Sequence, residues 1–226
     1  MTQPGGLDLP CRHPHPGRRP HQRRAVAFRL CRGIHGTYPR VARRFPEFRG
    51  RCKGLIKAAA RSQDPVIFLE HKALYRRMES RTREPDSDYV IPFGCGRIRR
   101  EGRDATIVTW GASVYQALEI AKRKELEGRS LEVLDIRSIA PLDEELIYES
   151  VKKTNRVLIL HEDSLTQGFG AEISARIAEH CFEYLDAPVM RVAALDSFVP
   201  SATSLEEAVL PSMDDLTNTL GKLLAY

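Results

Sequence analysis

Short apolar runs alternate with longer amphipathic stretches over the second half of the chain. The runs have the length and continuity of strands buried on both faces of a parallel sheet. We predict four such strands, at residues 105–110, 131–136, 156–160 and 189–193. The stretches between and after them predict four helices, at about 113–127, 143–153, 171–185 and 213–224. This alternation is typical of an α/β fold, a parallel-sheet three-layer sandwich with helices on both faces.

Residues that favour the beginning or the end of a helix support two of these predictions. Ser113 is predicted as the N-cap of the first helix and Gly128 as the residue that closes it. Pro141 and Asp143 are predicted to open the second helix.

Upstream of residue 105 the pattern is shorter and is interrupted by a linker. Residues 53–61 have the pattern of a helix end, residues 62–65 of a turn, and residues 66–69 of a buried strand. Residues 76–92 are polar and contain two prolines, so no helix or strand is expected there. A small strand-containing module therefore precedes the sandwich.

Charge is divided unevenly along the chain. Residues 1–52 contain 12 arginines, no lysine and only two acidic residues, Asp8 and Glu47, which gives 12 − 2 = +10. The remainder has 23 basic and 28 acidic residues, or −5, and the two parts sum to the +5 of the whole chain. Residues 1–52 also hold seven of the 14 prolines and show no apolar periodicity. We predict that they form a disordered basic segment ahead of the sandwich.

Other interpretations of residues 1–52 compete with disorder. Clustered arginines can release counterions from phosphates, but no aromatic platform or known motif accompanies them, and we expect no nucleic-acid partner. A mitochondrial transit peptide would be rich in serine, which this segment lacks, and a signal peptide would need an apolar core. GC-rich DNA encodes arginine, proline, glycine and alanine in almost any frame. Out-of-frame translation is therefore an interpretation of residues 1–52 to which we give the same weight as to disorder.

Composition excludes further classes. No apolar run approaches the ~18 residues of a membrane span, so no membrane partner is expected. The cysteines match neither a CxxC redox pair nor a zinc site, which predicts inert thiols in a reducing compartment. They are Cys11, Cys31, Cys52, Cys95 and Cys181.

Two predicted strand ends offer little catalytic chemistry, although ligands collect at the carboxyl ends of parallel strands. Thr109-Trp110-Gly111 lacks the GxGxxG and GxxxxGK[ST] fingerprints, so a tight turn is the favoured role. Glu70-His71-Lys72 could meet an anionic ligand or a partner chain, but an exposed charge run is favoured.

The third strand end carries a histidine between an apolar run and two carboxylates. His161, Glu162 and Asp163 directly follow the predicted strand at 156–160, and a glycine-rich turn follows them. This histidine could serve as an acid or base. A lone His-Glu pair lacks the second histidine of a metal site, so the favoured role is hydrogen bonding of His161 and Glu162 across a subunit or domain contact.

Five stretches resemble the β subunit of the thiamine-diphosphate-dependent 2-oxo acid dehydrogenases. They are residues 64–76 (DPVIFLEHKALYR), 91–94 (IPFG), 106–111 (TIVTWG), 135–143 (DIRSIAPLD) and 161–170 (HEDSLTQGFG). The resemblance runs in order from about Lys53 to Tyr226 and is nearest to the branched-chain, or 2-oxoisovalerate, type, with the pyruvate type next. It implies that the sandwich is a transketolase C-terminal-type domain.

The resemblance also implies a division into domains. Residues 53–77 correspond to the last helix and strand of the family's pyrimidine-binding domain, 78–88 to a linker, and 89–226 to the C-terminal domain. In the complete enzyme, thiamine diphosphate and Mg²⁺ support decarboxylation of a 2-oxo acid and transfer of the acyl group to lipoyl-lysine. The family's activating glutamate should precede Lys53, where nothing resembles its surroundings, and the metal site belongs to the α subunit. We therefore expect no catalytic or cofactor-binding residue here, and no activity of the chain alone.

Few functional positions carry over from the family. Ala59, Ser62 and Asp64 correspond to backbone-carbonyl ligands of a structural potassium ion. His161, Glu162 and Tyr226 are expected to contact a subunit or partner. Cys95 stands where relatives carry lysine, a departure with no evident functional meaning.

The implied partners are an α subunit, a second β subunit and a lipoyl acyltransferase core. The cytoplasm of a bacterium is expected in preference to the mitochondrial matrix. The alternative is a free-standing module of the same fold that scaffolds assembly without catalysis.

Overall fold

A computed structural model describes residues 42–44, 49–75, 78 and 84–226. Most of the predicted disordered segment, 1–52, therefore lies outside the described residues. Its described parts belong to two elements, because Ala42–Arg44 form strand β1 and helix α2 begins at Arg49. The described strands make two sheets, one of three strands in the order β2-β1-β6 and one of five in the order β3-β5-β4-β7-β8.

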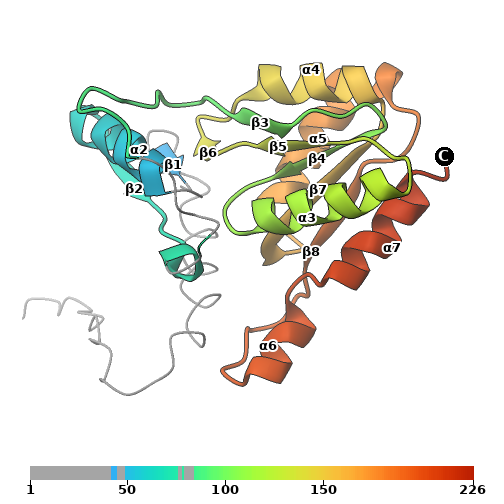
Figure 1. The fold of residues 1–226 in the computed structure, drawn as a ribbon. Helices are drawn as coiled ribbons and strands as arrows, with labels where there is room; N and C mark the ends of the chain where they lie inside the picture. The colour runs from blue at the N-terminus through green and yellow to red at the C-terminus, as the bar shows by residue number, and fades with distance from the viewer. Residues whose placement is uncertain (1–41, 45–48, 76–77, 79–83) are drawn as a thin grey trace, which may run out of the picture.

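The smaller sheet belongs mainly to an N-terminal module, the name used here for β1, α2, β2 and η1. Its elements after β1 are α2 (Arg49–Arg61), β2 (Val66–Phe68) and the 3₁₀ turn η1 (Lys72–Tyr75). Strand β1 pairs in parallel with β2 and antiparallel with β6 (Ser138–Ala140), which comes from the other half of the chain. Figure 1 shows this module to the left of the larger sheet.

The larger sheet is the centre of the C-terminal domain, the name used here for β3 to α7. Its strands are β3 (Arg97–Arg100), β4 (Ala105–Thr109), β5 (Leu131–Asp135), β7 (Val157–Ser164) and β8 (Met190–Ala194). The pairs β4–β5, β4–β7 and β7–β8 are parallel, and only β3 runs antiparallel to its neighbour β5. Strands β4 and β5 are buried along their whole length, as continuous apolar runs predict for central strands.

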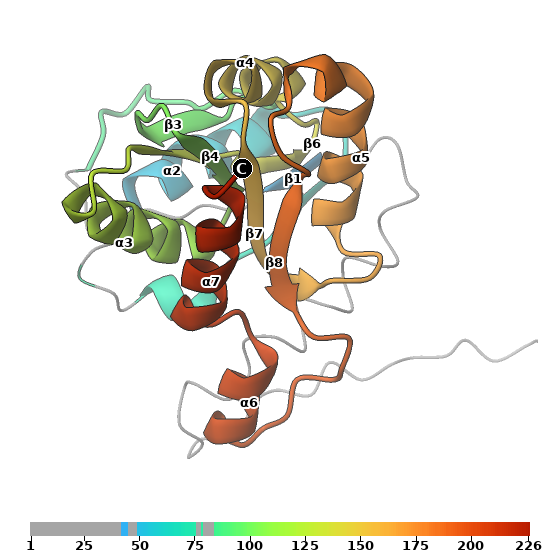
Figure 2. The ribbon, with the colours of Figure 1, turned by 90° about the vertical axis from the view of Figure 1, so that its right-hand side faces the viewer.

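Helices cover both faces of this sheet and enclose two apolar cores. The helices are α3 (Ser113–Leu126), α4 (Glu144–Thr154), α5 (Phe169–Cys181), α6 (Thr203–Val209) and α7 (Met213–Leu223), and a 3₁₀ turn, η3 (Phe182–Tyr184), follows α5. One core lies under α3 and α7 and the other under α4 and α5. Figure 2 shows these two pairs on opposite sides of the strands. The predicted three-layer α/β sandwich is confirmed.

The predicted helix ends are right at two positions and wrong at a third. Asp143 caps α4 by accepting a hydrogen bond from the Leu146 amide at 3.3 Å, and Gly128 follows α3 with a positive φ of 79°. Ser113 is not the N-cap of α3. Ala112 holds that position without a side-chain cap and already has helical φ and ψ, because the left-handed Gly111 turns the chain into the helix one residue earlier.

Other differences concern short or charged segments. Strand β7 extends to Ser164, so His161, Glu162 and Asp163 lie inside the strand and not after it. Strands β3 and β6 and helix α6 were not predicted, because they are short or strongly charged and lack a clear period. Residues 84–92, the part of the predicted linker from Glu84 on, contain no helix or strand, as predicted.

The linker lies against α2. A Cβ atom at Gly54 would come within 2.8 Å of the Tyr89 ring and 2.9 Å of Ile91, so the absence of a side chain lets helix and linker meet closely. The Ile91 amide donates to the Gly54 carbonyl at 3.3 Å, and Lys53 Nζ donates to Glu84 at 2.8 Å. These contacts fix the linker on the N-terminal module.

Candidate functional site

The carboxyl ends of β4 and β7 are the place where the chain order of the sheet reverses. From β4 the chain crosses to β5 on one side, and from β7 it crosses to β8 on the other. Ligands of open α/β sheets bind at such a reversal. Here the two strand ends supply Trp110 and His161, which lie against each other.

His161 is part of the protein interior. Its side chain has no exposed surface, and its ring stacks on Trp110 with centroids 5.2 Å apart and planes 8° apart. Phe169 also meets the Trp110 indole edge-on, with ring centroids 5.9 Å apart. The Asp163 amide donates to His161 Nδ1 at 3.2 Å, so the proton of the neutral ring sits on Nε2. A histidine held in this way has no access to a dissolved substrate.

The glycine-rich turn after His161 exists to accommodate its ring. A Cβ atom at Gly170 would lie 2.2 Å from His161 Nε2, and one at Gly168 would lie 2.1 Å from the Ser164 carbonyl oxygen. Both distances are too short for any side chain. The Gly-x-Gly spacing is therefore a packing requirement of this strand end.

Glu162 points away from the core and makes the contact between the two halves of the chain. Its Oε2 lies 2.8 Å from His71 Nε2, a pair separated by 91 positions in the sequence. His71 follows β2 and is itself buried, and its carbonyl accepts from the amide of Leu74 in η1. The sequence interpretation put His161 and Glu162 at a subunit or domain contact. Within this chain Glu162 joins two modules, while His161 has no surface left for a partner.

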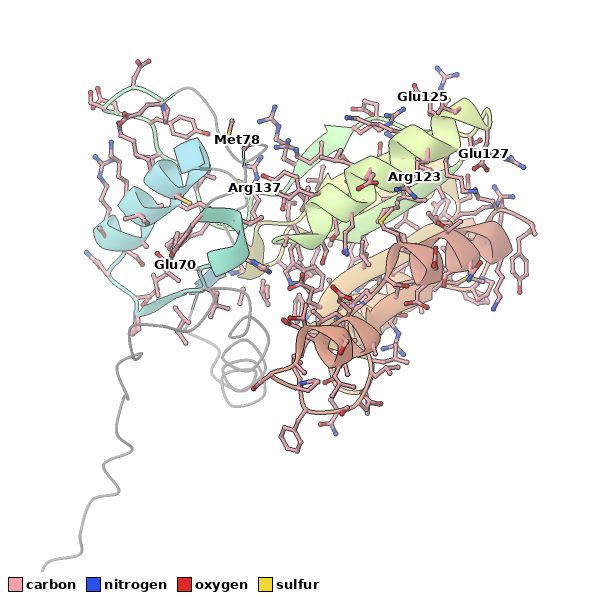
Figure 3. All side chains as sticks on the ribbon, turned by 60° about the horizontal axis from the view of Figure 1, so that its bottom comes forward. Glu70, Met78, Arg123, Glu125, Glu127 and Arg137 are labelled. Atoms are coloured by element: carbon pink, nitrogen blue, oxygen red, sulfur yellow. The ribbon has the colours of Figure 1, made fainter. Side chains whose placement is uncertain are left out.

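A second charged pair closes the end of β5. Asp135 has no exposed surface, and its carboxylate accepts from the Arg137 amide at 3.2 Å, with Arg137 Nε 3.6 Å away. Arg137 has a left-handed backbone with φ of 49° and leads directly into β6. In Figure 3 it lies at the boundary that faces the N-terminal module, as does Met78. The sequence interpretation did not single out this pair, although two opposite charges at the end of an apolar strand were a visible signal.

The predicted strand end at Glu70-His71-Lys72 has an exposed and a buried part. Glu70 is exposed and accepts a hydrogen bond from the Tyr75 hydroxyl, whereas His71 is buried. Burial, and then the hydrogen bond and charge of Glu70, raise the pKa of Tyr75 to about 12. Burial and Glu70 also raise the pKa of the Cys52 thiol. Both groups are therefore protonated near neutral pH, and neither is an activated nucleophile.

The three positions compared with a potassium site lie close together, Ala59 in the last turn of α2 and Ser62 and Asp64 in the turn between α2 and β2. The Ala59 carbonyl accepts from the Ser62 amide at 3.2 Å, and Ser62 Oγ accepts from the Asp64 amide at 3.2 Å. The end of α2 and the following turn thus bring the three residues together, and potassium binding there stays a prediction.

Tyr226 follows α7 and is 64% exposed. The apolar face of α7 is already used inside the domain, where Leu216, Leu220 and Leu223 pack into the core under α3. Only the outer side of this helix and Tyr226 remain available, and a partner contact at Tyr226 stays a prediction.

The described residues contain no cluster of the usual metal-ligating side chains. Within residues 42–44, 49–75, 78 and 84–226, no three histidine, cysteine or carboxylate side chains are grouped so that they could hold a metal ion. The buried charges at the strand ends are engaged with one another. No step of a thiamine diphosphate reaction is therefore assigned to these side chains. The helices of the same residues are also too short or too polar to cross a membrane.

The fold and the junction define a class of protein, the three-layer α/β domain that closes against a preceding strand-containing module. Residues 94–216, more than half of the chain, match the family described as "Transketolase, C-terminal domain". The chain belongs to this family. The match lies inside the predicted C-terminal domain, 89–226, and its fold agrees with the mixed five-stranded sheet.

Curated relatives come from two kinds of 2-oxo acid dehydrogenase. The chain is 40% identical over 176 residues to the 2-oxoisovalerate dehydrogenase subunit beta of Bacillus subtilis (strain 168), covering 77% of this chain and 53% of the relative. It is 44% identical over 166 residues to the mitochondrial pyruvate dehydrogenase E1 component subunit beta-2 of Oryza sativa subsp. japonica, covering 73% and 44%. The chain thus spans about half the length of the curated relatives it matches.

A solved structure with a similar fold is titled "Split gene transketolase, inactive beta4 tetramer". It is 29% identical, with a TM-score of 0.65 over 84% of this chain and 59% of that chain. The branched-chain type is not singled out by these comparisons, because relatives of the pyruvate type are equally similar.

Proposed function

We propose that the chain is part of the β subunit of a thiamine-diphosphate-dependent 2-oxo acid dehydrogenase. The complete enzyme would release CO₂ from a 2-oxo acid and transfer the remaining acyl group to lipoyl-lysine, with the cofactor supplying the carbanion chemistry. The observation that carries the proposal is the similarity to E1 β subunits across both the N-terminal module and the C-terminal domain. Partners of the chain would be an α subunit, a second β subunit and a lipoyl acyltransferase core.

The role we assign to this chain is subunit contact and not cofactor binding. Its conspicuous polar side chains at the strand ends are used in internal pairs, such as His71 with Glu162 and Asp135 with Arg137. We further propose that the chain alone is inactive, and that its type is 2-oxoisovalerate dehydrogenase, with the pyruvate type as the alternative. A bacterial cytoplasm remains our proposed location.

Reconstitution tests this role. The chain is mixed with the α subunit of the Bacillus subtilis 2-oxoisovalerate dehydrogenase, and the subunit beta of that enzyme serves as the positive control. We expect co-sedimentation and competition with the control subunit. We expect no release of CO₂ from 2-oxoisovalerate when the chain is alone with thiamine diphosphate and Mg²⁺. Failure to bind under conditions where the control binds would reject the proposal, and CO₂ release by the chain alone would reject its inactivity.

The type is tested in the same format with an α subunit of a pyruvate dehydrogenase. Tighter binding to the 2-oxoisovalerate enzyme's α subunit supports the branched-chain type, and the reverse order supports the alternative.

A free-standing assembly module is the second candidate. The observation that favours it is the similarity to a structure whose title describes an inactive assembly of β chains. Such a module would associate with its partners and leave the turnover of a complete dehydrogenase unchanged when added to it. A subunit of the enzyme would instead compete and reduce turnover.

A further inference from the structure

Arg137 is a buried cation whose side-chain hydrogen-bonding groups are unused. It follows β5 at the junction between the C-terminal domain and the N-terminal module (Figure 3), and only 7% of the residue is exposed. Its Nε lies 3.6 Å from the Asp135 carboxylate, which is beyond hydrogen-bond distance. Within the described part of the chain, the guanidinium makes no hydrogen bond. Asp135 therefore balances the charge of Arg137 but leaves its N–H donors without acceptors.

The strand ends around Arg137 carry further unpaired donors. Thr109 lies opposite Asp135 in the β4–β5 pair, and Ser138 follows Arg137 and begins β6. Both hydroxyl oxygens are enclosed, and neither has a hydrogen-bond partner among the residues that the structure describes. Buried polar groups of folded proteins are nearly always paired, so each exception calls for an explanation. Water could pair the hydroxyls, but a cation with several free N–H groups favours an anion with more than one acceptor oxygen.

The end of the guanidinium can be reached from solvent. Its Nε is enclosed beside Asp135, but Nη1 and Nη2 are not fully enclosed, and 9% of the Arg137 side chain is exposed. The edge that Nη1 and Nη2 form presents two parallel N–H groups. This spacing matches two oxygens of one carboxylate or phosphate group. An anion can therefore bind at this edge while Nε stays beside Asp135.

The backbone holds Arg137 in place before any ligand binds. Its φ of 49° lies in the left-handed region, which is uncommon for a residue other than glycine and is concentrated at functional sites. The Arg137 amide donates to the Asp135 carboxylate at 3.2 Å, so the same carboxylate fixes the backbone and balances the side chain. We propose that Arg137 binds an oxyanion, meaning a carboxylate or a phosphate group, through Nη1 and Nη2.

A bound oxyanion would also tighten the junction. Arg137 immediately precedes β6, and β6 pairs with β1 of the N-terminal module, with Ser138 in register with Arg44. A ligand that binds only the closed arrangement stabilises that arrangement. Hydrogen exchange at the amides of β6 should therefore slow when the ligand is saturating. Oxyanion binding by Arg137 does not depend on the proposed function, so each can fail without the other.

An NMR titration of the full chain tests the site directly. Inorganic phosphate and acetate are added in separate experiments, with sodium chloride keeping the ionic strength constant, because salt screens weak charge interactions. The signals followed are the Arg137 Nε–H and the backbone amide of Ile139 in β6. We expect both signals to shift and to saturate. Saturation by phosphate alone identifies a phosphate site, saturation by acetate alone identifies a carboxylate site, and saturation by both identifies a general oxyanion site.

Two substitutions should change the binding in opposite directions. Arg137→Gln removes both terminal nitrogens and should weaken binding by about tenfold or more, as measured at Ile139. Asp135→Asn keeps an acceptor for the Arg137 amide but removes the competing negative charge, so it should tighten binding by about fivefold. Arg129→Gln is the matched control, because it removes the same charge at an exposed position and should leave binding unchanged.

Three results would overturn the inference. They are shifts that grow linearly with neither anion saturating, saturation that persists in Arg137→Gln, and equal responses of Asp135→Asn and Arg129→Gln. Arg137→Gln leaves Asp135 buried without its cation, so this variant could fail to fold. In that case the comparison of Asp135→Asn with Arg129→Gln decides, because both of these variants keep Arg137.

Discussion

The C-terminal domain and the N-terminal module are stabilised in different ways. The domain buries two apolar cores, one on each face of a sheet whose central strands have almost no exposed side chains. The module has strands of three residues, and those of β2 are only half-buried. Its order depends on contacts with residues outside it, namely the β1–β6 pairing, the linker on Gly54, and His71 with Glu162. Apolar burial grows with the size of a unit, so a unit this small depends on its neighbour.

This comparison predicts that a disruptive substitution in the core of the C-terminal domain destabilises both the domain and the N-terminal module. Gly170→Ala would force a methyl group against the buried His161 ring, and overpacking at such a site costs about 3 kcal/mol of unfolding free energy. Urea denaturation measures the loss. Gly221→Ala, in the last turns of α7, is the control because a Cβ there meets nothing within 4 Å. The control should be neutral or should stabilise by about 0.5 kcal/mol. Equal effects of the two variants would contradict this prediction.

Removal of the partner of a buried charge in the C-terminal domain should have the next largest effect on the free energy of unfolding. Glu132 has no exposed surface, and its carboxylate is paired with Lys153, which also donates to Glu101 at 2.8 Å. Burial alone would lower the pKa of Lys153, but the hydrogen bonds to Glu101 and Glu132 outweigh it and raise that pKa. Lys153→Met leaves Glu132 buried without its cation, at a cost of about 2 kcal/mol after allowance for the partial exposure of Lys153.

The matched control for that variant is Arg123→Met, which removes an exposed ion pair with Glu119 on α3. Its effect on the free energy of unfolding should stay within about 0.5 kcal/mol. Because the folded pKa of Lys153 is raised, its stabilising effect is complete below the ordinary lysine pKa. It is lost as pH rises through the folded value. A Lys153→Met variant as stable as the wild type would show that Glu132 does not need its partner.

Breaking the contact between the two regions should loosen only the smaller one. Glu162→Ala removes the acceptor for His71, and a charge-assisted hydrogen bond of this kind contributes about 1 kcal/mol. Hydrogen exchange should become faster at the amides of β2 and α2 and stay unchanged in β4 and β5. Glu162→Gln keeps an acceptor oxygen and should restore most of the protection. Uniformly faster exchange in all four elements would mean that the module and the domain unfold together.

The N-terminal module and the C-terminal domain each contain a tyrosine with a raised pKa, which can be compared at high pH. Burial and Glu70 raise the pKa of Tyr75 in the module to about 12, and burial and Glu144 do the same for Tyr148 in the domain. Both folded values lie above the ordinary tyrosine pKa near 10, so the stability that each contributes is complete below about pH 10. It is lost as pH rises toward 12. In an ultraviolet titration of tyrosinate, Tyr75→Phe and Tyr148→Phe should each remove one late-titrating group, and a titration unchanged by both would contradict the prediction.

The sequence predicted the fold of the C-terminal domain better than the contacts between that domain and the N-terminal module. Continuous apolar runs marked β4, β5 and the core of β7, and Asp143 and Gly128 marked helix ends, because these signals are local. Strand β7 runs through His161 to Ser164 because stacking on Trp110 and pairing of Ser164 with Ala194 continue it past the apolar run. Such contacts have no local signature.

The candidate site was predictable only in part. His161 and Glu162 stood out as polar residues at a strand end, but the partner of Glu162 is His71, 91 positions away, and no single-sequence pattern links them. The stacking of His161 on Trp110 depends equally on the pairing of β4 with β7. The Asp135–Arg137 pair was predictable in principle, because two opposite charges flank the apolar Ile136 at the end of a predicted strand.

Gly54 lets the linker lie directly against α2. The Tyr89 ring and Ile91 occupy the space that a side chain at position 54 would need. The spacing between these two residues and the helix is thereby set by contact and not by chain length. An inserted residue at Val90 would move either Tyr89 or Ile91 off its place, so we expect this stretch to tolerate substitutions at its exposed positions better than a change in length. Any chimera that joins this C-terminal domain to another module must carry the helix and its linker across as a single piece.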